Sequence, residues 1–419
     1  MRTVRPPVAK SQPPALAPTP VAIPRAEGTA RLALIQALIP LGLKAVEHAL
    51  DQEVTALAGA RYAHDDAHPD IVRWGAQAGS IYLADQKLPL QVPRVRDRRA
   101  GHELPLTTYQ HFQTPRALDV GLFRRVLGGL SCRAYEAAAE TVPAAFGLAK
   151  SSVSRRFIRA SARELRRLLE RRLDDREWLV LLLDGKTFAA DGIVIALGVT
   201  STGEKRLLGM VQTATENKPV CAAFLRELVE RGFTTPHGLL VVLDGAKGLR
   251  AAVRDVFGGD VPVQRCQWHK RENVVRYLPK QEQPLWRRKL QAAYAHVSHA
   301  AAQRALHRLL PELRVLNASA ARSLEEGLEE TLTLHRLGVF TELGTSFKTT
   351  NLIGSVMARL EDKTLRVDRW RTSDQKVRWC AAALLAVEHQ FRRVKGYAHL
   401  PLLERALAAK ITPSMTAAA

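Results

Sequence analysis

Two aspartates in the middle of the chain, Asp184 and Asp244, each follow a run of aliphatic residues and each precede a glycine. The runs are 180–183 and 239–243. An aliphatic run that ends in an Asp-Gly pair is typical of a buried strand followed by a turn. If the two strands are neighbours in one sheet, the carboxylates converge, and hard oxygen ligands of this kind are those that Mg²⁺ prefers. The pattern predicts a site for Mg²⁺ or Mn²⁺ held by Asp184 and Asp244.

The alternative for either aspartate alone is an ordinary turn, because Asp-Gly is a common turn pair. Two occurrences in matching contexts, followed closely by Lys186 and Lys247, favour a shared site. Two divalent ions about 3.5–4 Å apart activate a nucleophile and stabilise the leaving oxygen when a phosphodiester is cut. A pair of carboxylates could hold ions for chemistry of this kind.

A Cys-x-x-His pair, Cys266 and His269, follows the second aspartate. Such a pair supplies two ligands for zinc, but a structural zinc needs four, and the sequence contains no second pair with matching spacing. A structural zinc site is therefore disfavoured.

The elements around the aspartates follow a definite order. Hydrophobic patterning predicts three strands, a helix, a strand and a helix. The expected strands are 180–183, 193–199, 207–212 and 239–243, and the expected helices are 220–231 and 247–257. This is the order of an α/β ribonuclease-H-like core. Doubly wound sheets contain similar fragments, and the placement of the acids favours the ribonuclease-H-like alternative.

A third motif, Thr349-Thr350-Asn351, completes a set that resembles a known family. In combination with the two aspartates and Cys266-Gln267-Trp268-His269, it is similar to the bacterial insertion-sequence transposases of the Mutator-like type. The resemblance extends from about residue 30 to about residue 400. It implies a DDE-type enzyme that uses two aspartates and a glutamate, and this chain has Gly354 at the position of the glutamate. It also implies that His269 lies beside the active site, where it orients DNA or the scissile phosphate.

The resemblance implies a transposase that binds the terminal inverted repeats of double-stranded DNA as a homodimer or higher oligomer, then catalyses hydrolysis and strand transfer. It also implies a helical insertion at about 275–340 in a catalytic core spanning 171–400. Glycine is about 1 kcal/mol less favourable than alanine inside a helix, so Gly354 fits the replacement of a functional residue. An alternative function is a catalytically inactive copy that occupies the repeats or inhibits active relatives. A nuclease for branched nucleic acid explains neither the insertion nor the Thr-Thr-Asn motif.

Composition agrees with a nucleic-acid partner. The 62 Lys and Arg residues outnumber the 41 Asp and Glu residues, which gives 419 residues a formal net charge of +21. The four scattered cysteines form no Cys-x-x-Cys pair and indicate a reducing cytoplasm. No apolar run approaches the ~20 residues that span a bilayer, so we expect a cytoplasmic, nucleoid-associated protein without a membrane partner.

The N-terminal part is expected to bind DNA. Residues 1–28 are proline-rich and predict a flexible tail, and residues 29–170 predict an α-rich DNA-binding region. Within that region we expect a helix over 30–61 that is interrupted at Pro40, and a short β unit over 73–95. The arginine-rich segment 94–99 follows, and its Arg94 and Arg96 are candidate phosphate contacts, with a solvated surface as the alternative.

Residues 131–170 resemble a helix-turn-helix. The first helix is expected over 133–140, the turn at 146–148, and the second helix from Lys150, with Ser151 or Ser152 as N-cap. Lys150, Ser152, Arg155 and Arg156 would present donors to DNA from the start of that helix. The alternative is a pair of packed helices with a basic exterior. Residues 401–419 are expected to form a C-terminal tail.

Overall fold

The structure, a computed structural model, describes residues 28–62, 69–83, 86–113, 116–135, 149–188, 191–213, 217–365, 367 and 369–416. Contacts between residues divide the chain into two units. Of the described residues, those up to 113 belong to the first unit and those from 116 onward to the second. By these contacts the chain divides near residue 115, and the expected DNA-binding region over 29–170 stays a prediction. The proline-rich segment, apart from its last residue, lies outside the described residues.

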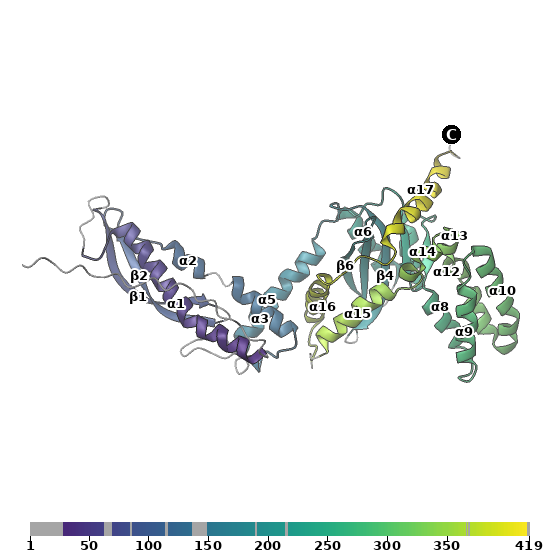
Figure 1. The fold of residues 1–419 in the computed structure, drawn as a ribbon, viewed down its shortest axis with the longest axis horizontal. Helices are drawn as coiled ribbons and strands as arrows, with labels where there is room; N and C mark the ends of the chain where they lie inside the picture. The colour runs from purple at the N-terminus through teal and green to yellow at the C-terminus, as the bar shows by residue number, and fades with distance from the viewer. Residues whose placement is uncertain are drawn as a thin grey trace, which may run out of the picture. The chain divides into compact units, whose positions relative to one another are not determined.

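The first unit combines a long helix with an antiparallel sheet (Figure 1). Its elements are α1 (Gly28–Ala58), β1 (Ile71–Leu83), β2 (Gln86–Asp97), β3 (His102–Leu104) and α2 (Thr107–Gln113). Apolar residues of α1, among them Val46, Leu50 and Val54, are buried against Ile81 and Val95 of the sheet. The expected β unit is confirmed, and it is larger than the α-rich description of this region implied.

The expected interruption of the first helix was wrong, because α1 continues through Pro40. A proline inside a helix removes one backbone hydrogen bond and disfavours the helix locally. Here the neighbouring Ile39 is buried in the same cluster as Val46 and Leu50. Burial of that apolar face outweighs the local defect.

The second unit is built on a five-stranded sheet with the strand order β6-β5-β4-β7-β8. The strands are β4 (Trp178–Phe188), β5 (Asp191–Thr200), β6 (Lys205–Thr213), β7 (Leu240–Leu243) and β8 (Val263–Arg265). Strands β4, β5 and β6 pair antiparallel, whereas β7 runs parallel to β4 and β8 runs parallel to β7. All four strands expected from the sequence are confirmed, and β8 is an additional short strand.

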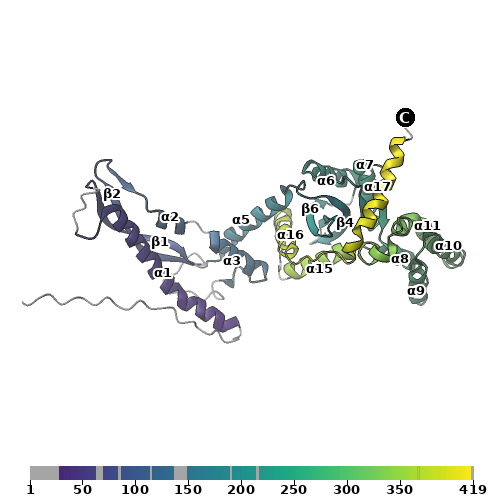
Figure 2. The same cartoon turned by 45° about the horizontal axis from the view of Figure 1, so that its top comes forward.

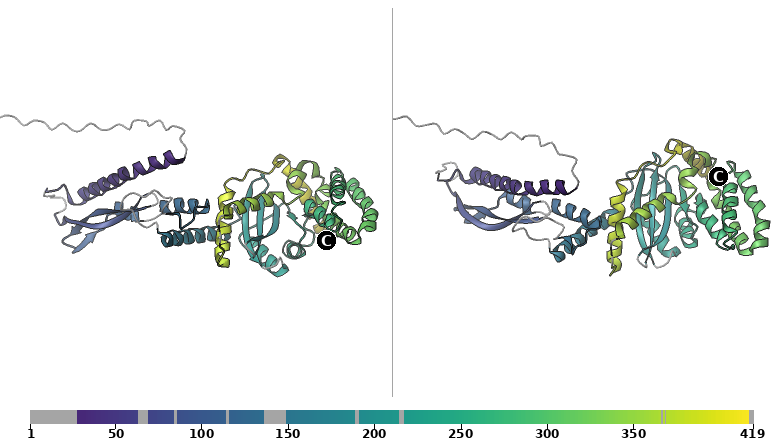
Figure 3. Two further views of the ribbon diagram at one scale, coloured as in Figure 1. Left: turned by 90° about the horizontal axis from the view of Figure 1, so that it is seen from below. Right: turned by 60° about the horizontal axis from the view of Figure 1, so that its bottom comes forward.

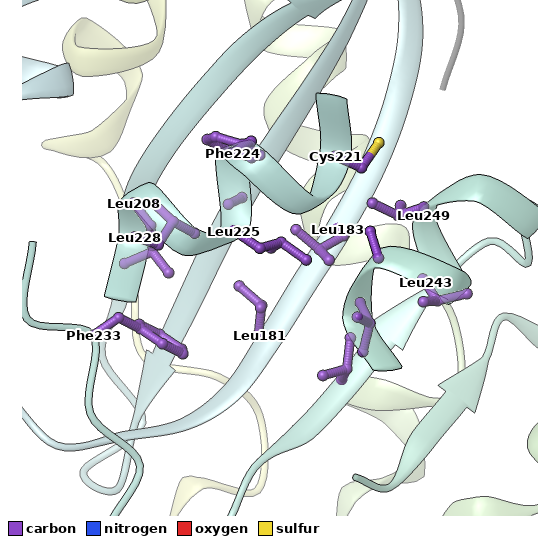
Figure 4. Close-up of a cluster of buried hydrophobic side chains, with 14 of the residues drawn as sticks. Leu181, Leu183, Leu208, Cys221, Phe224, Leu225, Leu228, Phe233, Leu243 and Leu249 are labelled. Carbon is purple, nitrogen blue, oxygen red and sulfur yellow. The ribbon is translucent and has the colours of Figure 1, made fainter. Parts of the chain in front are cut away.

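Helices lie on both faces of this sheet (Figure 2). On one face, α6 (Lys218–Glu230) and α7 (Lys247–Phe257) bury a cluster that includes Leu181, Leu183, Val241 and Leu243 of the central strands (Figure 4). On the opposite face, α15 (Asn351–Thr364) contacts β4 and also α16 (Ser373–Glu388), which lies alongside β6. The two faces of the sheet are therefore covered by different helices. A side chain on a central strand points either toward α6 and α7 or toward α15.

A helical segment lies between β8 and α15, as expected (Figure 3). Its helices are α8 (Gln267–Val275), α9 (Gln283–Tyr294), α10 (His299–Leu316), α11 (Ala318–Glu325), α12 (Leu328–Thr331), α13 (Thr333–Arg336) and α14 (Phe340–Phe347). It has an apolar core of its own, in which Trp286, Leu306 and Leu324 are buried. This segment thus packs as a helical insertion with its own core, joined to the sheet where α12 and α13 contact β8.

The helices that precede the sheet are α3 (Arg116–Leu127) and α5 (Lys150–Leu169). The second helix of the expected helix-turn-helix is confirmed and begins at Lys150, whereas most of the first helix and the turn fall on 136–148, outside the described residues. The expected cap was wrong: the N-cap is Ala149, with no side-chain cap hydrogen bond. The helix begins two residues earlier than a Ser151 cap requires, so both serines lie inside its first turn.

The C-terminal segment is helical rather than a tail. After the short 3₁₀ turn η1 (Tyr397–His399), α17 spans Leu400–Thr416. Leu400, Leu403 and Leu407 are buried and recur at helical spacing, which explains why the segment orders. Across the described residues, no helix is long and apolar enough to span a membrane.

Candidate active site

The two aspartates stand at matching positions of neighbouring parallel strands. The pairing of β4 with β7 ends at Leu183 and Leu243, and the next residue on each strand is Asp184 or Asp244. Neighbouring strands lie about 4.8 Å apart, so the two aspartate backbones are adjacent. One detail of the expectation was wrong: β4 continues beyond Asp184 to Phe188, because it forms a long hairpin with β5.

Both carboxylates project from the same face of the sheet. Successive side chains of a strand point to opposite faces. Leu183 and Leu243 are buried under α6 and α7 (Figure 4), so Asp184 and Asp244 project from the opposite face, over which α15 lies. An ion pair between Lys186 of β4 and Glu361 of α15, at 2.5 Å, confirms that this face meets α15.

The turn after Asp244 fixes the direction of its side chain. The Ala246 N–H donates to Asp244 Oδ1 at 2.9 Å, which ties the carboxylate to its own loop. Gly245 between them has a φ of 106°, in the left-handed region that favours glycine. A Cβ at this position would stand 2.1 Å from Arg265 Nε, so the close approach of Arg265 excludes any larger residue.

Cys266 joins three segments at the edge of the site. Its backbone N–H donates to Leu243 O at 2.8 Å, and it is the N-cap of α8. Its thiol accepts from the backbone N–H groups of His269, at 3.5 Å, and of Thr350, at 3.4 Å. Next to it, Gln267 N donates to Lys348 O at 2.9 Å. One buried sulfur therefore holds the start of α8 against the start of α15.

The electrostatics place His269 beside both aspartates. The pKa of His269 is raised, first by its hydrogen bond to Cys266 and further by the negative charges of Asp184 and Asp244. Burial alone would raise the pKa of Cys266, but hydrogen bonds from His269 and Thr350 outweigh it and the pKa is lowered. Thr350 Oγ1 lies 3.5 Å from His269 Nδ1 and also contacts the ring. His269 thus lies within electrostatic reach of the two carboxylates.

Position 354 lies in α15, one helical turn after Thr350. The Gly354 N–H donates to Thr350 O at 2.9 Å, in regular helical geometry. A Cβ built on Gly354 meets no atom within 4 Å. Neither backbone conformation nor packing therefore requires glycine here, and a longer side chain has room.

The nearest acid along this face of α15 is Glu361, seven residues and about 10 Å further along the helix. Its carboxylate pairs with Lys186. Glu361 therefore does not replace the acid that is missing at position 354.

The predicted DNA contacts have different environments. On α5, Lys150 and Arg155 are exposed and Ser152 is half-buried, whereas Arg156 is buried with 7% of its surface exposed. Arg156 lies close enough to the phenol of Tyr135 for its charge to oppose the burial that raises the Tyr135 pKa. We therefore drop Arg156 as a direct phosphate contact and keep the other three as predictions.

In the first unit, the side chains of Arg94 and Arg96 are engaged within the protein. Arg94 forms a two-pronged ion pair with Glu103 of β3, in which its Nε lies 2.9 Å from Glu103 Oε2. Arg96 donates to Gly101 O at 2.9 Å and stacks its guanidinium 5.0 Å from the Trp74 ring centre. Both arginines remain partly exposed, and their contact with DNA stays a prediction.

Two residues in or near the site were given no individual role from the sequence. Thr350 belongs to a recognised motif, and its place directly before a helical pattern is a usual N-cap signal. Lys270 follows the Cys-x-x-His pair and is buried, with its ammonium donating to Ser323 O at 2.5 Å and to Glu326 O. Burial lowers the Lys270 pKa to about 8. No pattern in the sequence distinguishes such a lysine from a surface lysine.

The donors present suit a divalent cation in part. Asp184 and Asp244 offer hard carboxylate oxygens from one face of the sheet, which fits Mg²⁺ or Mn²⁺. Such a cation keeps several waters, so two carboxylates form the core of a site that a third would complete. The residues present fit the metal at two of three expected positions.

Comparison with known proteins identifies the family. The family model described as "Transposase, Mutator family" matches residues 34–392. A transposase of insertion sequence IS256 in transposon Tn4001 from Staphylococcus aureus is 26% identical over 69% of this chain and 75% of its own length. The IS406 transposase of Burkholderia multivorans is 24% identical over 84% of this chain and 90% of its own. The IST2 transposase of Acidithiobacillus ferrooxidans is 30% identical over 42% of this chain and 57% of its own. With the match covering most of its length, this chain belongs to the Mutator family of transposases.

Proposed function

We propose that this insertion-sequence transposase binds the terminal inverted repeats of its element as a homodimer or higher oligomer and has a ribonuclease-H-like catalytic core. The strand order β6-β5-β4-β7-β8, with three antiparallel strands followed by two parallel ones, supports that core. The helical insertion follows β8 and returns to the sheet through α15. The net charge of +21 supports a DNA partner, and we place the protein at the nucleoid in the cytoplasm.

The observation that carries the proposal is the meeting of four separate motifs on one face of the sheet. Asp184 and Asp244 come from neighbouring strands, His269 from α8, and Thr350 from the start of α15. Their contacts converge on His269, which touches Thr350 and has its pKa raised by both aspartates. Residues that are up to 166 positions apart in the sequence (184 to 350) thus form one site.

In this site, Asp184 and Asp244 hold the metal ions. When bound, the ions supply an activated nucleophile and stabilisation of the leaving oxygen, in a DDE-type hydrolysis and strand transfer. A ring N–H of His269 would donate a hydrogen bond to a non-bridging phosphate oxygen. Cys266 and Thr350 position that ring, and the carboxylate expected at 354 would face the same region.

A second candidate function rests on Gly354 itself. The chain supplies no acid at this position, and Glu361 is already paired with Lys186. A protein that keeps the fold and basic charge but lacks one ligand would bind DNA ends without cutting them. Such a copy would occupy the repeats or reduce the activity of relatives in mixed oligomers.

Cleavage of DNA ends tests the proposal and separates the two candidates. The substrate is duplex DNA from the sequences flanking the gene, and the compared proteins are the parent chain, Gly354→Glu and Gly354→Gln. With Mg²⁺ or Mn²⁺, cutting and joining by the parent chain would support the catalytic candidate. Binding by all three proteins with cutting by Gly354→Glu alone is the result that the binding-only candidate predicts. Cleavage by the parent at the rate of Gly354→Glu would show that another acid completes the site. No cleavage by any form, with binding retained, would contradict the assigned metal site.

A further inference from the structure

A cavity of about 790 Å³ opens beside α15 in the second unit. Three segments line it: the second turn of α15, the start of β6, and residues 389–392, which follow α16. Ser355, which directly follows position 354, stands at its edge, and Arg359 lies one helical turn further on. The cavity therefore adjoins the helix of the candidate site, but it shares none of the residues assigned there.

The lining of this cavity is basic. Lys205, Arg359, His389 and Arg392 line it, and no aspartate or glutamate does. Within the described part of the chain, none of these four side chains forms an ion pair with a carboxylate. Lys205 Nζ instead lies 5.6 Å from the Phe391 ring centre, and Arg359 donates to Gln390 Oε1 at 3.2 Å.

Neighbouring arginines show that this lack of acids is local. Arg206, the next residue after Lys205, donates to both carboxylate oxygens of Asp175 at 2.9 and 2.7 Å. Arg171 forms a two-pronged pair with Glu388, just before the segment that lines the cavity. Acids are thus available on both sides of the cavity, and each is paired outside it.

Uncompensated cations at close range disfavour one another. Burial lowers the pKa of Lys205, and the charge of Arg359 lowers it further. An anion in the cavity would relieve this repulsion, and two guanidinium groups and an ammonium together match the several oxygens of a phosphate. A single carboxylate would leave most of these donors unused.

We infer that this cavity binds a backbone phosphate of the DNA strand held at the candidate active site. The inference rests on the proposed function, since it assumes that DNA reaches the face covered by α15. Arg359 lies about 7.5 Å along the helix axis from position 354, five residues at ~1.5 Å each. A DNA strand whose scissile phosphate lies at Asp184 and Asp244 would then have a second phosphate contact beside α15.

The salt dependence of DNA binding tests this inference. Each phosphate contact contributes about 0.9 to the slope of log affinity against log salt for duplex DNA. We expect Lys205→Gln and Arg392→Gln each to reduce that slope by about 0.9. Affinity would then fall about 3.5-fold less between ~50 and ~200 mM salt than it does for the parent. The probe is a fluorescein-labelled duplex from the DNA that flanks the gene, and the readout is fluorescence anisotropy.

Arg206→Gln is the matched control, because it removes the same charge from the same strand but from a residue that pairs with Asp175. Its slope should equal that of the parent. Slopes for Lys205→Gln and Arg392→Gln that equal the control would overturn the inference while leaving the proposed function intact. Failure of the parent to bind any duplex would overturn both. Arg392 is exposed, so its variant tests the cavity even if the half-buried Lys205 is needed for folding.

Discussion

Thr350 and Gly354, at the two ends of the first turn of α15, differ in their contacts with the rest of the protein. At its start, Thr350 lies against Cys266 and His269, and its N–H donates to a buried sulfur. One turn later, Gly354 is exposed, and a side chain placed there would meet no neighbour within 4 Å. Both positions belong to the same motif, and our proposal has both facing the same site.

The difference separates what the fold requires from what the chemistry requires. Replacing Cys266 would leave two backbone N–H groups without their buried acceptor, and an unsatisfied buried donor costs about 1–3 kcal/mol. Losing an acid at position 354 removes no contact of the folded protein. The scaffold that would position a third carboxylate therefore persists without it, because stability does not depend on that side chain.

The largest expected effect is on catalysis in the Gly354→Glu background. There, Asp244→Asn or Asp184→Asn should reduce metal-dependent cleavage at least about 100-fold, the upper range seen even for outer-shell partners of a metal. DNA affinity in the absence of metal should stay near that of Gly354→Glu. Cleavage that survives either change would mean that the two strands do not supply the ligands.

The next effect tests the contacts at the start of this turn, where Thr350 lies against Cys266. Cys266→Ala should lower the free energy of unfolding by about 2 kcal/mol, because the N–H groups of His269 and Thr350 lose their acceptor. The measurement is urea denaturation, with the half-exposed Cys132→Ala as control at under about 0.5 kcal/mol. Equal effects for the two cysteines would remove the contrast between the ends of the turn.

A smaller effect tests the free space around position 354, at the other end of this turn. Gly354→Ala should raise the free energy of unfolding by about 1 kcal/mol, since alanine favours the helix and its Cβ has free space. Gly245→Ala is the opposite control, because a φ of 106° and the nearby Arg265 side chain make it destabilising. A loss of stability in Gly354→Ala would show that position 354 is constrained by packing after all.

The smallest effect concerns the acid further along α15. Glu361→Gln removes an exposed ion pair with Lys186, and such pairs contribute about 0–1 kcal/mol. We expect little change in the urea midpoint and unchanged cleavage by Gly354→Glu. A marked fall in cleavage would instead assign Glu361 to the metal site. Its ion pair with Lys186 would then not keep it from acting as a metal ligand.

Patterns in the sequence predicted the parts of the fold that depend on local periodicity. The strands around Asp184 and Asp244 and the start of α5 at Lys150 agree with the structure. The adjacency of the two aspartates followed once their strands proved to be neighbours. The ribonuclease-H-like assignment and the roles of the site residues stay predictions.

Features set by distant contacts could not be predicted in this way. Helix α1 continues through Pro40 because the sheet of the first unit packs against it, and β4 extends past Asp184 because it pairs with β5. Arg156 is buried by elements that a helical pattern does not reveal, and Lys270 is buried beneath α11. In each case a neighbour far away in the sequence decides the outcome.

The most direct test of an intact site that lacks one ligand is the binding of Mn²⁺, followed by electron paramagnetic resonance, to the parent, Gly354→Glu and Gly354→Gln. We predict that Gly354→Glu binds Mn²⁺ about 10–100-fold more tightly than the other two, and that Asp184→Asn abolishes the gain. Equal affinity of the glutamate and glutamine forms would contradict the claim that position 354 faces the site formed by Asp184 and Asp244.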